Sequence, residues 1–141
     1  MKKTLIVALL CLLSATPAFA QLDDARAAKR AVRKNLTIRE WNTDARSKTR
    51  WMDRETTFDS EGRKIEETEY ASYGQKWRIV YSYDADGRVA KEVEYDDRNK
   101  ASCIRKFEYN SDGTKKKQYN YAPNGKLLTT KLFEYVTTES D

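Results

Sequence analysis

The chain repeats one short pattern, in which an aromatic residue is followed four positions later by glycine. The aromatic residues fall 12, 13, 12, 14, 12 and 14 positions apart, at Phe58, Tyr70, Tyr83, Tyr95, Tyr109, Tyr121 and Tyr135. All five glycines of the chain stand four positions after one of these aromatics, and Asn99 fills the one remaining slot. Glycine and asparagine adopt a left-handed backbone more readily than other residues. The repeat therefore predicts a series of tight turns at a nearly constant interval.

The residues around these glycines match the chemistry of hairpin turns. Asp84 begins the turn Asp84–Gly87, where its carboxylate can accept backbone amide bonds, and Pro123 presets φ in the turn Ala122–Gly125. A type I turn followed by a left-handed glycine is a common three-residue hairpin connection. Two further turns have the same form: Asp59–Gly62 and Asn110–Gly113. The turns after two of the tyrosines are less regular: Tyr70 and Tyr95.

About eight residues separate successive turns, which is an ordinary strand length. Connections this short join neighbouring antiparallel strands, so alternate turns should lie on the same rim of one sheet. Two more strands are expected upstream, at Ile38–Trp41 and Trp51–Phe58, with a polar loop at Asn42–Lys48. The sequence therefore predicts a mainly β fold, an antiparallel meander of about seven to nine strands that is open, curled or barrel-like.

Alternation along the expected strands predicts which side chains share a face. Before Gly87, apolar residues alternate with polar ones, so four of them should lie together: Trp77, Ile79, Tyr81 and Tyr83. In the next strand, Val89 should share a face with Val93 and Tyr95. Charged residues make up 35% of the chain, and aliphatic residues are too few for a deep two-sided core. We therefore expect a sheet with one aromatic face.

The first twenty residues match the layout of a secretory signal peptide. Two lysines precede an apolar run at Leu5–Leu13, and small residues allow cleavage after Ala20. The apolar run is shorter than the roughly 20 residues that span a bilayer, which argues against a membrane anchor. Lipidation at Cys11 is another alternative, disfavoured because Leu10 precedes the cysteine. We therefore expect an exported protein, periplasmic or extracellular, without a transmembrane segment after cleavage.

The rest of the chain divides into an N-terminal segment, a repeat domain and a tail. Leu22–Lys34 has a thin apolar stripe, acidic residues at its start and basic residues at its end, as a short helix would. A flexible basic arm is the alternative, because short isolated helices are weak. The expected organisation is a signal peptide at 1–20, a basic arm or short helix at 21–35, an antiparallel repeat domain at 36–136 and a frayed tail at 137–141.

Composition argues against several kinds of chemistry. The chain has no His, so the commonest general base and metal ligand is missing. After cleavage Cys103 is the only cysteine, which leaves no internal disulfide, and without a His partner its thiol is interpreted as structural. Cleavage also removes Lys2 and Lys3, which lowers the formal net charge from +5 to +3, so the high isoelectric point is only a weak hint of an acidic partner. Nucleic acid is not expected as a partner outside the cytoplasm.

The acidic residues also have simpler explanations than catalysis or metal binding. The turn Asp84–Gly87 resembles part of a calcium loop, but Val93 stands where an EF-hand requires Glu. Four glutamates each precede a repeat aromatic: Glu69, Glu94, Glu108 and Glu134. Their regular placement predicts cross-strand pairs with Lys and Arg rather than a catalytic carboxylate pair. We predict no metal site, no cofactor and no catalytic residue.

At the turns the sequence resembles a known repeat. Tyr81–Arg88, Thr57–Arg63 and Glu108–Gly113 resemble the tyrosine-aspartate (YD) repeat of RHS proteins, and the resemblance covers roughly residues 57–135. In that family stacked β-hairpins form large shells around a cargo, but this chain is too short to enclose one. In length, signal peptide and repeat style it is more similar to small exported YD-like proteins of Bacteroides-type bacteria, whose function is unknown. The resemblance implies hairpins and export, and it supplies no catalytic residue.

The densest aromatic clusters are the candidate binding residues: Trp77, Tyr81, Tyr83, Tyr119 and Tyr121. Tyr and Trp can stack on sugars and anchor protein interfaces. The simpler interpretation is that this face packs on the N-terminal helix or on itself. We expect a non-enzymatic binding or structural module of the cell envelope, with an envelope protein or glycan as its partner. The alternative is an envelope enzyme that acts on polysaccharide.

Overall fold

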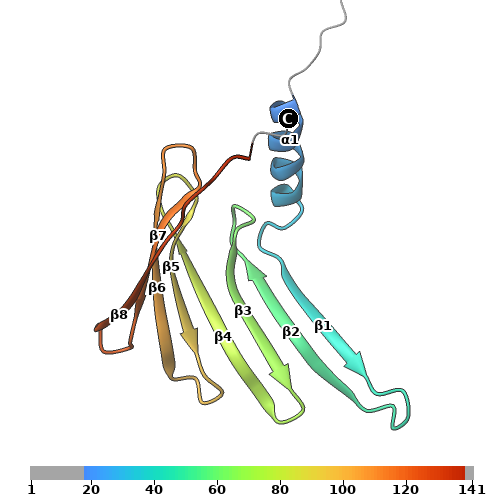
Figure 1. Ribbon diagram of the computed structural model, residues 1–141. Coiled ribbons are helices and arrows are strands. Elements are labelled where there is room, and N and C mark those ends of the chain that lie inside the picture. Colours follow the sequence, from blue (N-terminus) through green and yellow to red (C-terminus); the bar gives the residue numbers. More distant parts are fainter. Residues whose placement is uncertain (1–17, 139–141) are drawn as a thin grey trace, which may run out of the picture.

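The computed structural model describes residues 18–138, which form one helix and eight strands (Figure 1). The elements are α1 (Ala18–Ala31), β1 (Thr37–Thr43), β2 (Arg50–Phe58), β3 (Lys64–Ala71), β4 (Gly74–Tyr83), β5 (Val89–Tyr95), β6 (Ala101–Tyr109), β7 (Lys115–Tyr121) and β8 (Leu127–Leu132). The strands make a single antiparallel sheet in the order β1 to β8, which confirms the predicted meander. The sheet is open, and β1 and β8 form its two edges (Figure 1).

The element boundaries differ from the sequence expectations mainly at the N-terminus. The helix is present, but it begins at Ala18 and ends at Ala31 instead of spanning Leu22–Lys34. The predicted signal peptide at 1–20 and tail at 137–141 lie mostly outside the described residues, and both stay predictions. In the loop between β1 and β2, the Asp44 carboxylate accepts bonds from the backbone amides of Arg46 and Ser47 at 2.9 and 2.6 Å. This carboxylate stabilises the turn.

Five of the six repeat turns have the predicted geometry. In each, the left-handed residue donates its amide to the carbonyl three positions earlier, as Gly87 does to Asp84 at 3.0 Å. The turn after Tyr95 is one of the five, because Asn99 adopts φ 59° and donates to Asp96 at 3.1 Å. The expectation that this turn is less regular was wrong. Only the turn at Gly74 departs, since Gly74 pairs directly with Ala71 across a two-residue corner.

Each hairpin carries a β-bulge in its second strand. Between β4 and β5, for example, Ser82 lies opposite Lys91 while Tyr83 lies opposite Val89, so Ala90 is the extra residue. An extra residue moves everything beyond it to the other face of the strand. Val89 therefore lies on the opposite face from Val93, and the expectation that they share a face was wrong.

The bulges also place the repeat aromatics alternately on the two faces of the sheet. Directly opposite residues of antiparallel strands share a face, so the register can be followed from strand to strand. We call face 1 the one that carries Phe58, Tyr83 and Tyr109. Face 2 carries Tyr70, Tyr95 and Tyr121. Both faces of the sheet therefore carry aromatic residues, and the expectation of a single aromatic face was wrong.

Tyrosine hydroxyls connect successive hairpins along one rim. We call rim 1 the edge formed by the turns 59–62, 84–87 and 110–113. The Tyr83 hydroxyl donates to the Lys64 carbonyl at 2.7 Å, and the Tyr109 hydroxyl donates to the Val89 carbonyl at 2.8 Å. The Tyr135 hydroxyl repeats the contact with the Lys115 carbonyl at 2.8 Å. The three acceptors are the first residues of β3, β5 and β7, which all begin at rim 1, so these bonds fix the spacing of the hairpins.

Arginines of the same turns cover the tyrosine rings. Arg63 pairs with Asp59 at 2.8 Å and lies 4.8 Å above the Tyr83 ring, and Arg88 covers Tyr109 in the same way at 5.0 Å. Among the described residues the only buried apolar side chain is Phe58, which is 7% exposed. The sheet is therefore stabilised by cross-strand and cation–aromatic contacts instead of a deep core.

Candidate functional site

The helix α1 is held against rim 1 at a single turn. A side chain at Gly62 would place its Cβ 2.1 Å from the Arg30 carbonyl oxygen, so only glycine permits this approach. The chain after the helix continues the contact, because the Asn35 amide donates to the Asp59 carbonyl at 2.9 Å. The Phe58 amide likewise donates to the Leu36 carbonyl at 2.9 Å. These contacts position α1 beside the ends of β2, β3 and β4.

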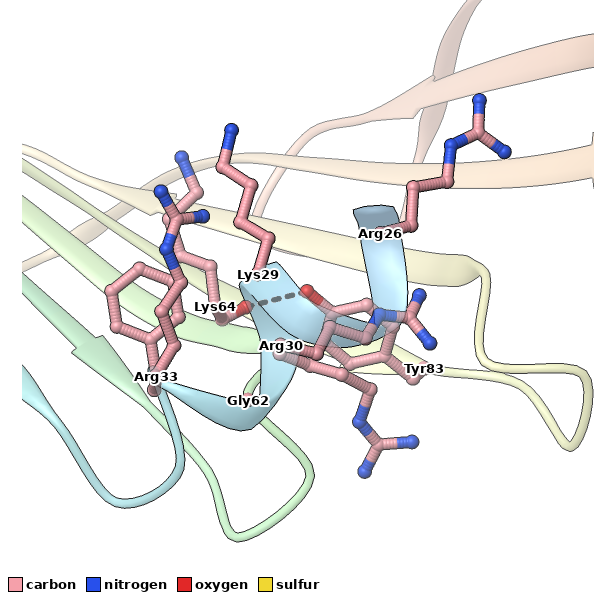
Figure 2. Close-up of a pocket in the computed structure, with 9 residues that line it drawn as sticks. Arg26, Lys29, Arg30, Arg33, Gly62, Lys64 and Tyr83 are labelled. Carbon is pink, nitrogen blue, oxygen red and sulfur yellow. Dashed lines mark hydrogen bonds between the residues drawn. The ribbon is translucent and has the colours of Figure 1, made fainter. Parts of the chain in front are cut away.

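A cleft of about 270 Å³ lies between the helix and rim 1 (Figure 2). It is lined by Arg26, Lys29, Arg30, Arg33, Phe58, Gly62, Arg63, Lys64 and Tyr83. Six of these nine residues carry a positive charge, and no carboxylate is among them. The cleft therefore gathers basic residues of α1, of the turn after it and of the start of β3 around two aromatic rings.

Three of the cations lie on one side of α1, and Arg33 follows in the turn just after the helix. Arg26, Lys29, Arg30 and Arg33 are spaced so that they follow each other along one helical face. We call these four residues the helix cations. In Figure 2, the side chains of Lys29 and Arg33 extend to the same side of the cleft. The Arg33 guanidinium lies 5.0 Å from the centre of the Phe58 ring, so this side chain also helps to cover the one buried aromatic.

The cations of the cleft differ in how their charge is balanced. Arg63 pairs with Asp59 at 2.8 Å and with Glu61 at 3.0 Å, and Lys64 pairs with Glu67 at 2.7 Å. Among the side chains of residues 24–138, no carboxylate lies within ion-pair distance of any of the four helix cations. The positive charge of the cleft therefore comes mainly from α1 and the turn that follows it.

Tyr83 forms the floor of the cleft as a neutral hydrogen-bond donor. Burial of the ring, together with the nearby Asp59 carboxylate, raises the pKa of Tyr83. Its hydroxyl is directed to the Lys64 carbonyl, as the dashed line in Figure 2 shows. The Tyr83 ring, with the Arg63 guanidinium 4.8 Å from its centre, lines the cleft among the cations, which suits a ligand with both an anionic group and a weakly polar body.

The structure does not bring the five predicted binding residues together. Trp77, Tyr81 and Tyr83 lie on β4 and share face 1. Tyr119 and Tyr121 lie on β7 and belong to face 2, because they stand opposite Lys106 and Ile104. All five are half-buried.

The tyrosines of this set make contacts within the sheet. The Tyr81 hydroxyl donates to Glu67 at 3.2 Å, and the Tyr119 hydroxyl donates to Glu108 at 2.8 Å. Burial and the Glu67 carboxylate raise the pKa of Tyr81, so its hydroxyl stays protonated. The Lys106 ammonium lies 5.3 Å from the Tyr121 ring centre. Much of the hydrogen-bonding capacity of these residues is therefore already used by the fold.

Two of the four glutamates that precede repeat aromatics pair with a cation across the strands, as predicted. Glu69 pairs with Lys76 at 2.8 Å, and Glu94 pairs with Arg105 at 2.5 Å, as expected. Glu108 accepts the bond from Tyr119 instead of pairing with a cation. In the described part of the chain, no three His, Cys, Asp or Glu residues are grouped so that they could hold a metal ion.

The sequence contained the basic residues of the cleft without revealing the cleft itself. Arg30 and Arg33 match the basic end of a helix, which suits the helix dipole and needs no ligand. Their role as cleft residues depends on the contact of Arg30 with Gly62, which joins distant parts of the chain. The spacing of the four cations along one helical face was the only feature of the sequence that pointed to a basic site.

No family model matches the chain, and no curated protein matches it. Among solved structures, the crystal structure of the GtfA/B complex bound to UDP and GlcNAc is 15% identical, with a TM-score of 0.32, and the match covers 67% of this chain and 20% of that one. A mutant of S. aureus TarM in complex with Fondaparinux, alpha-GlcNAc-glycerol and UDP is 17% identical, with a TM-score of 0.33, covering 76% and 23%. The chain spans about a fifth of the length of these proteins, and a likeness this distant indicates nothing about its function.

Within the described residues, no helix combines the length and apolar content that crossing a membrane requires.

Proposed function

We propose that this protein is an exported, non-enzymatic module of the cell envelope that binds an anionic group in the cleft between α1 and rim 1. The observation that carries the proposal is the set of helix cations without a carboxylate partner among residues 24–138, gathered beside two aromatic rings. Export rests on the signal-like N-terminus and on the YD-like repeats of the sequence. The function is therefore surface recognition, not turnover.

The chemistry of the cleft favours a phosphate-bearing ligand over a neutral one. Guanidinium groups bind phosphate in a bidentate manner, and three of the four helix cations are arginines. A volume of about 270 Å³ suits a single sugar-sized group, with Tyr83 as the surface on which its ring lies. Phosphorylated glycans and glycolipids of the envelope have this combination of anion and sugar.

The aromatic row of β4 extends the proposed binding surface away from the cleft. Trp77 and Tyr81 share face 1 with Tyr83, so a longer glycan could lie along them. Tyr119 and Tyr121 belong to the other face and are not part of this surface. Trp77→Ala should weaken capture of a longer phosphorylated glycan and leave a single sugar phosphate bound.

Calorimetry with a charged and a neutral sugar tests the proposal. Glucose 6-phosphate should bind the purified protein, with affinity that falls as salt is raised, and glucose should not. Lys29→Gln combined with Arg30→Gln should weaken binding about tenfold, or roughly 1.4 kcal/mol. These two positions spare Arg33, which covers Phe58. Lys100→Gln combined with Lys116→Gln is the matched control, because it removes the same charge from exposed sites outside the cleft.

Two results would contradict the proposal. Equal losses of affinity in the cleft variant and in the control would mean that only the overall charge attracts the sugar phosphate. Release of sugars from envelope polysaccharide by the purified protein would favour the enzymatic alternative. The arrangement of the glutamates supports a non-enzymatic function, since Glu67, Glu69 and Glu94 each pair with a cation.

A further inference from the structure

The last strand of the sheet is an exposed edge with little charge. Every residue of β8 is exposed, and Leu127 and Leu132 are 47% and 70% exposed. Lys131 is the only charged residue of this strand. Edge strands of soluble proteins are usually protected by several charges or by a covering segment, because their free backbone groups can pair with another chain. Charge of that kind is nearly absent from β8.

The first strand has the matching character at the opposite edge. All of β1 is exposed, including Ile38 at 36% and Trp41 at 48%. Its glutamate, Glu40, has no ion-pair partner among the described residues, and the same holds for Lys131. The other charged residue of β1, Arg39, is paired with Glu55 at 2.5 Å. The two edges thus carry exposed apolar residues, and their charges without an ion-pair partner among the described residues, Glu40 and Lys131, have opposite signs.

We propose that β8 of one copy pairs with β1 of a second copy, so that the meander continues from molecule to molecule. The strand β8 runs toward rim 1 and β1 runs away from it, so the two are antiparallel when the sheets are placed side by side. The faces also match, because Glu40 and Lys131 both belong to face 1 by the register. A second copy is therefore a partner that fits both edges.

One register of β1 against β8 pairs the two opposite charges and also brings apolar residues of the two strands opposite each other. With Glu40 opposite Lys131, Ile38 falls opposite Phe133 and Trp41 falls opposite Thr130. Trp41 then lies diagonal to Leu132, within reach of an aromatic side chain. A symmetric pairing of β8 with β8 would instead bring two Lys131 ammonium groups near each other. Charge therefore favours the head-to-tail arrangement, which produces rings or open chains of copies.

Sedimentation of charge variants tests the pairing. The purified protein should sediment as a concentration-dependent assembly, whereas Lys131→Glu alone and Glu40→Lys alone should each remain monomeric, because like charges then meet. An equimolar mixture of the two variants should assemble again, since each edge of one now meets the opposite charge on the other. Lys100→Glu, in the exposed turn between β5 and β6 and away from both edges, is the matched control and should assemble like the original protein.

The mixture separates this arrangement from the alternatives. Failure of the mixture to assemble, while both single variants keep the circular dichroism spectrum of the folded sheet, would overturn the proposal. A protein that stays monomeric at millimolar concentration would overturn it as well. Assembly that Lys131→Glu leaves unchanged would point to another surface, and would equally exclude the pairing of β8 with β1.

Discussion

At the scale of single residues, glycine has two different roles in the repeat. Gly87 has φ 74° and open space around its Cα, so only the backbone conformation requires glycine. Gly62 has nearly the same φ of 73°, but the Arg30 carbonyl also occupies the place of a side chain. Among the glycines, Gly62 alone therefore connects the repeat to the helix and the cleft.

This difference can be measured with a pair of alanine variants. Gly87→Ala should lower the free energy of unfolding by roughly 1–2 kcal/mol, the cost of a left-handed alanine. Gly62→Ala should lower it further and should release α1, because the new methyl group collides with the Arg30 carbonyl. Urea unfolding gives the free energies, and amide exchange at residues 26–34 reports the release of the helix. Equal losses and an unchanged exchange rate would show that α1 does not dock on this turn.

At the scale of elements, the sequence predicted the strands and turns but not the faces. The positions of the five glycines and Asn99 were sufficient to locate the hairpins, because each turn needs one residue with a left-handed backbone, and that need shows directly in the residue type. The bulges at Ala90 and its counterparts have no local signature in the sequence, since small, polar and charged residues all fill them. Without the bulges, simple alternation assigns Tyr83 and Tyr121 to one face, and the predicted binding set fails for this reason.

The cleft could not be predicted for a related reason. Local spacing predicts that α1 is helical, but its contact with Gly62 depends on where the turn lies in three dimensions. The functional interpretation of the cations follows only from that contact.

The elements should also differ in their local stability. Strands β4, β5 and β6 lie between other strands and contain the tyrosine bonds from Tyr83 and Tyr109, whereas β1 and β8 are exposed along their whole length. Amide hydrogen exchange of the dilute protein should therefore be slowest in β4–β6 and fastest in β1 and β8. If β8 exchanged as slowly as β5 at low concentration, an intramolecular segment would have to cover that edge.

At the scale of the whole molecule, stability should be insensitive to pH near neutrality. The chain has no His, so few groups titrate between about pH 5 and 8. Below this range the turn carboxylates matter. The Arg88 amide and guanidinium hold the pKa of Asp84 below its usual value, and the Thr114 hydroxyl and amide do the same for the pKa of Asp112.

The sign of the acid effect follows from these lowered pKa values. As the pH falls, these aspartates bind protons in the unfolded chain near the ordinary Asp pKa of about 3.9, and in the folded turns only at a lower pH. The stabilisation that the charged aspartates give to the fold is therefore fully present above that pH and is lost as the pH falls below it. The melting temperature should be flat from about pH 5 to 8 and should fall below about pH 4. Asp84→Asn should reduce the size of that fall. A melting temperature that changed steadily between pH 5 and 8 would mean that other titrating groups control stability.

The most direct test of the cleft assignment is a residue-by-residue map of binding. The backbone amide spectrum of the labelled protein would be recorded during titration with glucose 6-phosphate, with glucose as the neutral control. We predict that the shifts gather at residues 26–33 in α1 and the turn after it, at residues 58–64 around the first turn of rim 1 and at Tyr83, and that glucose moves none of them. Shifts centred on Tyr119 and Tyr121, or spread evenly over the exposed lysines of the sheet, would contradict the assignment of the cleft as the binding site.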